Sequence, residues 1–425
     1  MKKITPIVTF GFIAAVSLNA SATAEFTSSE KTFQDTYRTA PYVGDFTNNG
    51  KMDVLYGGQW SHKLEMPGCQ VHGDGCVWQM MQSFYKNQGD DTWVFDGVTS
   101  TGDASDHTLV LPTHGIRPST WNQYAALDYN NDGLLDVVLY GTSDWDVLLP
   151  ENMKNKNYVI LYKNLGDGKF EEVAEAQFPS ANCWNTSTRF IPFALAVGDY
   201  DHDGFTDLLV SDSGIGGIRL FRNVDGSGEF EPVDLSGLNT IDGNVFFADL
   251  NNDGWLDIIC QGNLSNKREG YVLINNNGVF EQATLGGFTV PRSSGAYIAD
   301  LDKDGNIDFL ATGWGSTFEA NIYYNDGPDE NYFSSSVQTG STGLGGEEHF
   351  RPYIRDFDGD GILDIYYSGK NLCQIYYGNI MNGYTKGSGM TRYQYGFAGL
   401  GDLNGIRLRP RQDREWAARK SKTAR

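Results

Sequence analysis

Cysteine is scarce in this sequence of 425 residues, which has only Cys69, Cys76, Cys183, Cys260 and Cys373. So low a count excludes the small scaffolds that use disulfides in place of a hydrophobic core. The stretch CQVHGDGC brings Cys69 and Cys76 close together, and in an exported protein they would close a small disulfide loop. The alternative is two free thiols in a surface loop. Cys260 and Cys373 lie in apolar, strand-like runs, and we interpret them as buried small side chains.

Long apolar runs are missing after the N-terminus. No later segment approaches 18 continuous apolar residues, which excludes a transmembrane helix there. The N-terminus reads MKKITPIVTFGFIAAVSLNASATAEF: two lysines, a mostly apolar run, and small residues at a cleavage site. This pattern predicts a signal peptide over residues 1–24. We therefore expect the mature protein to be secreted, periplasmic or at the cell surface.

Positive charge is also in short supply, because 32 Lys and Arg stand against 54 Asp and Glu, for a net charge of −22. Two of the lysines lie in residues 1–24, and residues 406–425 hold eight Lys and Arg against two acidic residues. Residues 25–405 therefore carry a net charge of −30. Neither nucleic acid nor anionic lipid is expected as a partner of so acidic a body. Cations are.

What the sequence has instead is a repeated acidic motif. Each copy places oxygen-bearing side chains at alternate positions before a glycine, and an apolar run follows. The copies are GDFTNNGKMDVLYGG from Gly44, LDYNNDGLLDVVLYG from Leu127, GDYDHDGFTDLLVSD from Gly198, ADLNNDGWLDIICQG from Ala248, ADLDKDGNIDFLATG from Ala299 and RDFDGDGILDIYYSG from Arg355. A seventh start, GLGDLNG from Gly399, loses the pattern after Gly405.

The surroundings of each copy indicate short strands. An apolar run such as FALAV precedes the acidic loop, and a run such as DLLVS follows it. A further run ends in an Asn-containing turn and a phenylalanine, as in VILYKNLGDGKFEEV. Helical periodicity is nearly absent. Four strands per repeat, joined by hairpin turns, predict an all-β protein of four-stranded blades. Seven motif starts predict a seven-bladed β-propeller whose last blade is incomplete.

The six full copies resemble the FG-GAP repeats of integrin α-subunit heads and the bacterial VCBS-type versions of that repeat. The resemblance implies that residues 25–405 form one propeller. It also implies that the acidic loops join the first two strands of each blade on one face. The loops between strands two and three, and those that link the blades, would then lie on the opposite face.

The spacing of the acidic loops suits calcium, which takes six to eight hard oxygen ligands at about 2.3–2.6 Å. Numbering each loop from its first aspartate, positions 1, 3, 5 and 9 offer side-chain oxygens and position 7 a backbone carbonyl. Glycine at position 6 permits a sharp reversal. The alternative is that Asp, Asn and Gly only make good turns. Clustered carboxylates repel one another without a cation, so we expect about five to six Ca²⁺ ions.

Loops one to six span residues 45–53, 128–136, 199–207, 249–257, 300–308 and 356–364, with a degenerate loop at 402–405. Loops three, five and six have four aspartates each and are expected to bind calcium most tightly, whereas loop one has Thr47 at position 3 and is the weakest candidate. His202 is at position 4 and is not counted. The expected ligands are Asp45, Asn49, Lys51, Asp53, Asp128, Asn130, Asp132, Leu134, Asp136, Asp199, Asp201, Asp203, Phe205, Asp207, Asp249, Asn251, Asp253, Trp255, Asp257, Asp300, Asp302, Asp304, Asn306, Asp308, Asp356, Asp358, Asp360, Ile362 and Asp364.

Four insertions in the first three repeats form a candidate ligand face. They span residues 58–82, 101–123, 142–157 and 176–190. Aromatic and imidazole side chains in them, among polar neighbours, suit sugar or peptide binding. The candidates are Trp60, His62, Trp78, Trp145 and Trp184. The alternative is that these aromatics pack the long loops onto the propeller.

The C-terminus departs from the rest of the chain. After Gly405 the motif and the acidity end together, and the sequence continues IRLRPRQDREWAARKSKTAR. We interpret residues 406–425 as a frameshifted or replaced reading frame. The alternative is a native basic tail that binds an acidic partner or the protein's own acidic face.

These observations predict an exported calcium-binding β-propeller that acts as a binding or adhesion module for glycan or extracellular protein. A polysaccharide-active enzyme, lyase or glycosidase, built on the same scaffold is the competing class, and a structural part of a surface assembly is a third. No catalytic residue is assigned, and the oligomeric state is left open.

Overall fold

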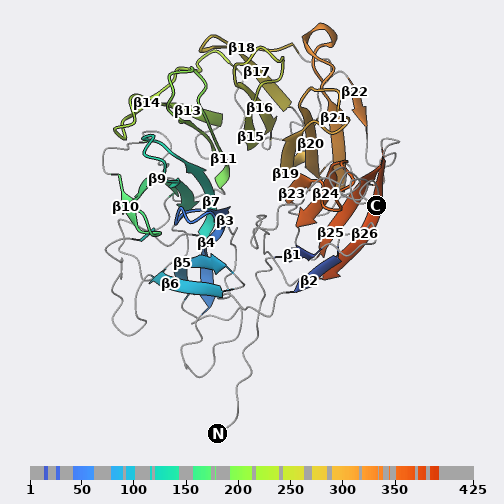
Figure 1. Cartoon of the computed structure of the whole chain (residues 1–425). Helices are drawn as coiled ribbons and strands as arrows, with labels where there is room; N and C mark the ends of the chain where they lie inside the picture. The colour runs from blue at the N-terminus through green and yellow to red at the C-terminus, as the bar shows by residue number, and fades with distance from the viewer. Residues whose placement is uncertain are drawn as a thin grey trace, which may run out of the picture.

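Among the residues that the structure describes, six antiparallel sheets of four strands each are arranged as blades around a common centre (Figure 1). The chain is thus an all-β propeller. This computed structural model describes residues 14–17, 25–28, 42–61, 78–89, 92–100, 115–116, 120–142, 157–173, 178, 192–212, 217–238, 243–262, 270–284, 290–314, 318–333, 335–337, 344, 351–368, 372–379 and 383–391. The seventh motif start, at Gly399, lies outside these residues, so the expectation of a seventh blade stays a prediction.

Within each blade the strands follow one another in sequence order. Blade one has β3 (Tyr42–Gly44), β4 (Asp53–Ser61), β5 (Trp78–Gly89) and β6 (Thr92–Ser100). Blade two has β7 (Thr120–Leu127), β8 (Asp136–Thr142), β9 (Asn157–Asn164) and β10 (Phe170–Glu172). Blade three has β11 (Pro192–Gly198), β12 (Asp207–Asp212), β13 (Gly217–Asn223) and β14 (Phe230–Pro232).

The second half of the ring repeats this order. Blade four has β15 (Gly243–Ala248), β16 (Asp257–Gly262), β17 (Gly270–Asn276) and β18 (Val279–Gln282). Blade five has β19 (Arg292–Ala299), β20 (Asp308–Trp314), β21 (Phe318–Tyr324) and β22 (Ser335–Val337), with the 3₁₀ turn η1 (Pro328–Glu330) before its last strand. Blade six has β23 (Arg351–Arg355), β24 (Asp364–Ser368), β25 (Leu372–Asn379) and β26 (Gly383–Thr391).

Two short strands stand apart from the blades. β1 (Ala14–Ser17) and β2 (Glu25–Ser28) pair antiparallel, with Ala14 opposite Ser28. Figure 1 places them between blade six and blade one. β1 falls within the residues assigned to the signal peptide, and that assignment stays a prediction. Among the described residues, no helix has the length and apolarity needed to cross a membrane.

The second strand of each blade is buried on both sides, which explains the continuous apolar runs after the acidic loops. In β12, Leu208 and Val210 pack toward blade two, whereas Leu209 packs toward blade four. All three side chains are 0% exposed. Apolar clusters of this kind fill each of the five interfaces from blade one to blade six. Successive side chains of the second strand therefore face the two neighbouring blades in turn, and their burial there holds the strand in place.

A phenylalanine after the third strand also serves the interface. Phe230 of β14 lies 5.2 Å, ring centre to ring centre, from Phe178, and Phe280 of β18 lies 5.6 Å from Tyr200 of the preceding blade. Both phenylalanines are at least 90% buried. The phenylalanine that recurs in the sequence is thus a contact between blades.

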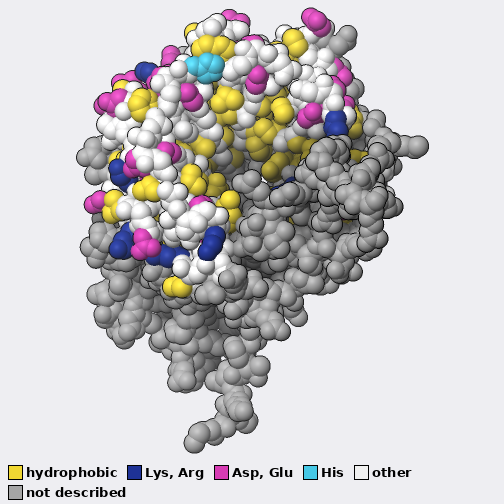
Figure 2. Space-filling view, viewed as in Figure 1, with side chains coloured by type: hydrophobic (Ala, Val, Ile, Leu, Met, Phe, Trp, Pro, Cys, Tyr) yellow, Lys and Arg dark blue, Asp and Glu magenta, His cyan; other side chains and the backbone are white. Residues whose placement is uncertain are grey.

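The strand order separates two faces. In an antiparallel blade, the loop between strands one and two and the turn between strands three and four lie at the same end. The loops between strands two and three, and the links between blades, lie at the other end. In the view of Figure 2, hydrophobic side chains gather around the hollow in the middle of the ring and acidic side chains lie toward its edge.

Candidate metal centre

All six acidic loops form the connection between the first and second strands of a blade. In loop three, the carboxylate of Asp199 accepts the backbone N–H groups of Asp203 and Gly204, at 3.2 and 3.0 Å. Gly204 has φ +90°, and the glycines at position 6 of the other loops have φ between +79° and +96°. Nothing lies within 4 Å of a Cβ added at these glycines. The glycine is therefore required by backbone conformation, not by space.

The aspartate at position 9, which we call the inner carboxylate, is buried in every loop. Asp207 is 0% exposed and accepts the backbone N–H groups of Tyr200 at 3.0 Å and Asn223 at 2.8 Å, one on each oxygen. Burial raises its pKa to about 7, against these two hydrogen bonds, and the nearby Asp201 and Asp203 raise it further. The inner carboxylates are Asp53, Asp136, Asp207, Asp257, Asp308 and Asp364.

The asparagine that binds the inner carboxylate also joins one blade to the next. The side-chain amide of Asn223, at the end of β13, donates to the carbonyl of Tyr129 in blade two at 2.8 Å. That of Asn275 donates to Tyr200 in blade three, also at 2.8 Å. Asn164 and Asn325 make the same contact, to Phe46 and Leu250. Inner carboxylates and these strand-end asparagines thus form a buried hydrogen-bonded chain from blade one to blade five.

Blade six departs from this pattern. Gly378 occupies the strand-end position there, and its backbone N–H donates to Asp364 at 2.9 Å. A Cβ at Gly378 would lie 2.4 Å from the carbonyl oxygen of Leu363, so no side chain fits. The interface between blades five and six has its apolar cluster, which includes Tyr367 and Tyr376, but Gly378 has no side-chain amide to donate to blade five.

The side chains at positions 1, 3 and 5, which we call the outer carboxylates where they are aspartates, form three groups that suit a cation. In each group, carboxylate oxygens lie within 4.8 Å of one another. The groups are Asp199, Asp201 and Asp203 in loop three, Asp300, Asp302 and Asp304 in loop five, and Asp356, Asp358 and Asp360 in loop six. Asp300 Oδ1 is buried and has no hydrogen-bond partner. A buried carboxylate oxygen left in this way fits a hard cation such as Ca²⁺, which would neutralise the group.

The remaining loops engage their polar side chains internally. In loops two and four, the amides of Asn130 and Asn251 donate to Asp132 and Asp253, at 3.1 and 2.9 Å. In loop one, the hydroxyl of Thr47 donates to Asp53 at 3.0 Å. Loop one, the weakest candidate by sequence, therefore has one of its expected metal-binding positions turned to its own inner carboxylate.

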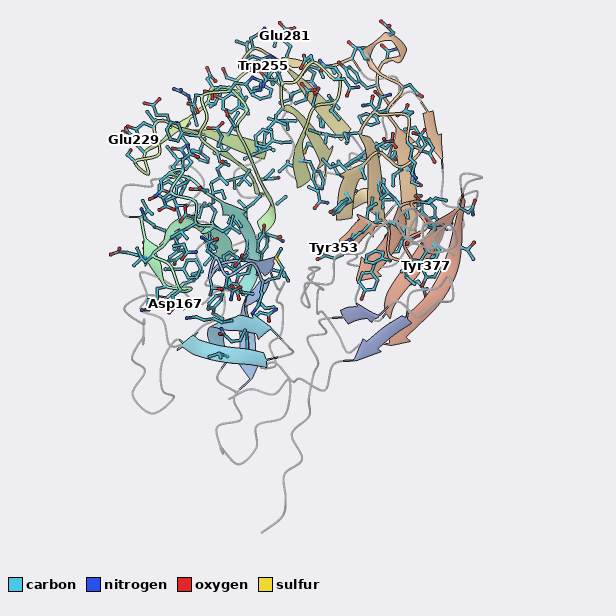
Figure 3. The ribbon with its side chains drawn as sticks, in the orientation of Figure 1. Asp167, Glu229, Trp255, Glu281, Tyr353 and Tyr377 are labelled. Carbon is cyan, nitrogen blue, oxygen red and sulfur yellow. The ribbon has the colours of Figure 1, made fainter. Side chains whose placement is uncertain are left out.

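The residue at position 4 contacts the next loop in the ring. His202 Nε2 lies 3.0 Å from the carbonyl oxygen of Gly254, and the His202 ring stacks on Trp255 with 4.1 Å between ring centres. The amide of Asn131 donates to Gly204 at 3.0 Å in the same way. Figure 3 shows Trp255 at the outer edge of the ring, whereas Tyr353 lies nearer its centre. Position 4 thus ties neighbouring loops together, and His202 faces the adjoining blade.

Comparison with known proteins agrees with this geometry. A family model described as an FG-GAP-like repeat matches residues 128–210, 199–260 and 300–367. The chain contains FG-GAP-like repeats that form a β-propeller. No curated protein matches the sequence.

Two solved structures resemble the FG-GAP propeller. One is an Agrocybe aegerita lectin that specifically recognises non-reducing terminal N-acetylglucosamine. It is 20% identical, with a TM-score of 0.52 over 87% of this chain and 83% of the lectin chain. The other is a protein of unknown function from Desulfotomaculum acetoxidans, 11% identical, with a TM-score of 0.36 over 74% of this chain and 80% of that one. The first likeness shows a shared fold.

The candidate ligand face of the FG-GAP propeller is described in part. Trp60 and Trp78 lie in the hairpin formed by β4 and β5, where Trp60 is opposite Gln79 and Ser61 is opposite Trp78. This end of the hairpin is the one away from loop one. The other members of the predicted set, His62, Trp145 and Trp184, lie outside the described residues, as do Cys69 and Cys76. Cys260 is buried in β16, as the sequence indicates.

Proposed function

We propose that this FG-GAP propeller is an exported glycan-binding module whose blades are stiffened by calcium on one face. The observation that carries the proposal is the separation of the two faces. The acidic loops and the turns after the third strands share one end of every blade, where the backbone is tied into the buried chain of aspartates and asparagines. The opposite end is left for a ligand, and the long hairpin of blade one brings Trp60 and Trp78 there.

Calcium in this proposal has a structural role. The outer carboxylates of loops three, five and six would each hold an ion, with support from the carbonyl at position 7. Loops two and four, and most weakly loop one, would bring the total to about five to six ions. The ion would remove repulsion between carboxylates that the folded chain forces together, so binding would stabilise the folded state. A rigid ring would then hold the ligand-binding loops in place.

The choice of a glycan over a protein ligand is supported by the shared fold with the N-acetylglucosamine-specific lectin and by the tryptophans in the candidate ligand face. The proposal includes three expectations from the sequence: export by a signal peptide at residues 1–24, a disulfide between Cys69 and Cys76, and an incomplete seventh blade that begins at Gly399.

A glycan array tests this proposal. Calcium-loaded protein should be retained on a defined class of glycan, with N-acetylglucosamine-terminated sugars as the first probe, and chelator should reduce retention. Trp60→Ala should weaken binding on the order of tenfold or more, because a stacked tryptophan carries a large share of binding energy. Val279→Ala is the control, since Val279 is apolar and 64% exposed. It lies at the start of β18, on the face of the acidic loops and away from the candidate ligand face. Absence of retention by folded protein would instead favour an extracellular protein partner.

A further inference from the structure

Loops three and five have the same four aspartates but different surroundings. Asp199, Asp201 and Asp203 form one group, and Asp300, Asp302 and Asp304 form the other. In both groups, carboxylate oxygens lie within 4.8 Å of one another. On sequence alone, the two loops are expected to bind calcium equally well. The residue that distinguishes them comes from the third strand of each blade.

In blade three that residue is Arg222, in β13. Its Nε donates to Asp201 Oδ2 at 2.5 Å, and its Nη2 donates to Asp203 Oδ2 at 2.7 Å. The carboxylates at positions 3 and 5 therefore share one guanidinium, and the Arg222 side chain is 37% exposed. Two charge-assisted hydrogen bonds from a planar group are among the stronger polar contacts in proteins. They engage two of the side chains that a cation in this loop would need.

In blade five the equivalent residue is Tyr324, in β21. The register is the same, because Arg222 and Tyr324 each precede a strand-end asparagine whose N–H donates to the inner carboxylate, at 2.8 Å for Asn223 and 2.9 Å for Asn325. Burial, followed by the charges of Asp308 and Asp302, raises the pKa of Tyr324. Its phenol offers no positive charge to loop five.

Other features of loop five agree with an uncompensated group. Asp300 Oδ1 is buried without a hydrogen-bond partner. The lysine of this loop, Lys303, donates to the carbonyl of Gly361 in loop six. Among the described residues, no Lys or Arg forms an ion pair with the aspartates of loop five.

Blade two is an intermediate case. Lys163 occupies the position of Arg222, and its Nζ lies 3.1 Å from Asp132 Oδ2. Blades four and six have Ile274 and Tyr377 at this position. A cation built into the third strand is thus a property of particular blades.

We propose that Arg222 is the resident cation of loop three, so that loop three binds calcium more weakly than loop five although both have the same four aspartates. This inference rests on the proposed binding of calcium to the acidic loops. Calcium enters loop three only by displacing the guanidinium from Asp201 and Asp203. Loop three consequently keeps its shape when calcium is withdrawn, whereas loop five depends on the metal.

Reciprocal substitutions in the full-length protein test the proposal. Arg222→Tyr gives loop three the residue of loop five, and Tyr324→Arg does the reverse. Hydrogen exchange measured across a calcium titration, on peptides containing residues 199–207 and 300–308, reports each loop separately. In the unmodified protein, loop five should become protected at the lower calcium concentration. Arg222→Tyr should lower the midpoint for loop three on the order of tenfold to a hundredfold, and Tyr324→Arg should raise that for loop five by a similar factor.

Arg222→Lys is the matched control. Lysine keeps the positive charge but cannot donate two hydrogen bonds in the fixed geometry of a guanidinium, which is the situation of Lys163 in blade two. The calcium midpoint of loop three should therefore lie between those of the unmodified protein and Arg222→Tyr. If Arg222→Tyr fails to fold, Arg222→Gln removes the charge with less change in shape and should shift the midpoint in the same direction. Equal midpoints for loops three and five, unaltered by these substitutions, would overturn the proposal while leaving calcium binding intact. A protein in which no loop responds to calcium would overturn both this inference and the calcium part of the proposed function.

Discussion

The inner and outer carboxylates of each loop belong to one short motif but lie in different environments. The inner carboxylate is at most 1% exposed in all six loops, and its oxygens accept backbone N–H groups from its own loop and from the third strand. The outer positions are half-buried or exposed and vary from loop to loop, with Thr47, Asn130 and Asn251 in place of aspartate. One repeat therefore contains a part that does not vary and a part that does.

This difference separates two tasks. The inner carboxylate and the strand-end asparagine satisfy backbone groups that would otherwise be buried without partners, and they do so across the boundary between blades. The outer positions gather charge at the surface, where Lys163 balances it in loop two and Arg222 in loop three. The inner network joins the blades, and the outer groups are where we propose that cations bind.

The largest expected effect comes from cutting the inner network. Asn275→Ala removes the hydrogen bonds from the side-chain amide to Tyr200 and Leu256 and the one that its oxygen accepts from Gly278. The carbonyl of Tyr200 that loses its partner is buried and the other two backbone groups are half-buried, so the free energy of unfolding should fall by about 2–4 kcal/mol. Urea denaturation followed by tryptophan fluorescence measures the change.

The neighbouring Asn276 supplies the control, since it is exposed in the same strand. Asn276→Ala should change the free energy of unfolding by less than about 0.5 kcal/mol. Equal losses from the two substitutions would mean that the contact between blades contributes no special stability.

A second prediction concerns pH and links the ionisation of the inner carboxylates to the binding of calcium. Burial raises the pKa of Asp136, Asp207, Asp308 and Asp364 to about 7. The unfolded value is about 4, so the folded protein binds protons more tightly than the unfolded chain. Without metal, this contribution to stability is fully present below about pH 4 and is lost as the pH rises through about 7.

Calcium supplies positive charge to the ionised loops, so its stabilising effect should be greatest above pH 7. The Tm difference between calcium-loaded and chelator-treated protein should be roughly 5 °C or more at pH 8 and should shrink toward pH 5.5. Differential scanning calorimetry at both pH values measures it, with magnesium as a control cation that tolerates this flexible oxygen geometry poorly. A calcium effect that is independent of pH would contradict the link between the inner carboxylates and the metal.

Much of this architecture could be predicted from the sequence because each repeat has the same residue types at the same spacing. The alternate polar positions, the glycine at position 6 and the apolar runs predicted the acidic loops and the blades, and the φ of Gly204 confirms why glycine recurs. In the sequence, the recurring asparagine indicates only a turn. Its hydrogen bond to the preceding blade joins residues 75 or more positions apart, and 94 for Asn223 and Tyr129, which a local pattern cannot reveal.

The role of Arg222 escaped sequence reasoning for a related reason. Counting carboxylates ranked loop three with loops five and six, but the residue that balances its charge lies 15 positions after the loop ends, on another strand. A signal was nonetheless present, because FYKN, LYKN and LFRN place a basic residue before the asparagine in the first three blades, whereas LINN and YYND do not. Reading that position required knowing that the third strand ends beside the acidic loop.

The smallest expected effect is at the contact between loops three and four. The ring of His202 stacks on Trp255 at an angle of 15° and also lies within hydrogen-bond distance of Gly254. Asparagine stands at this position in loops two and four, with the same positive φ, so His202→Asn preserves both the backbone conformation and a donor for Gly254. Only the stacking is lost, and the free energy of unfolding should fall by about 0.5–1 kcal/mol. A double-mutant cycle with Trp255→Ala isolates that coupling. Because position 4 lies outside the ligand set, the calcium midpoint of loop three should stay unchanged in His202→Asn, and a shift would show that the outer carboxylates sense the neighbouring blade.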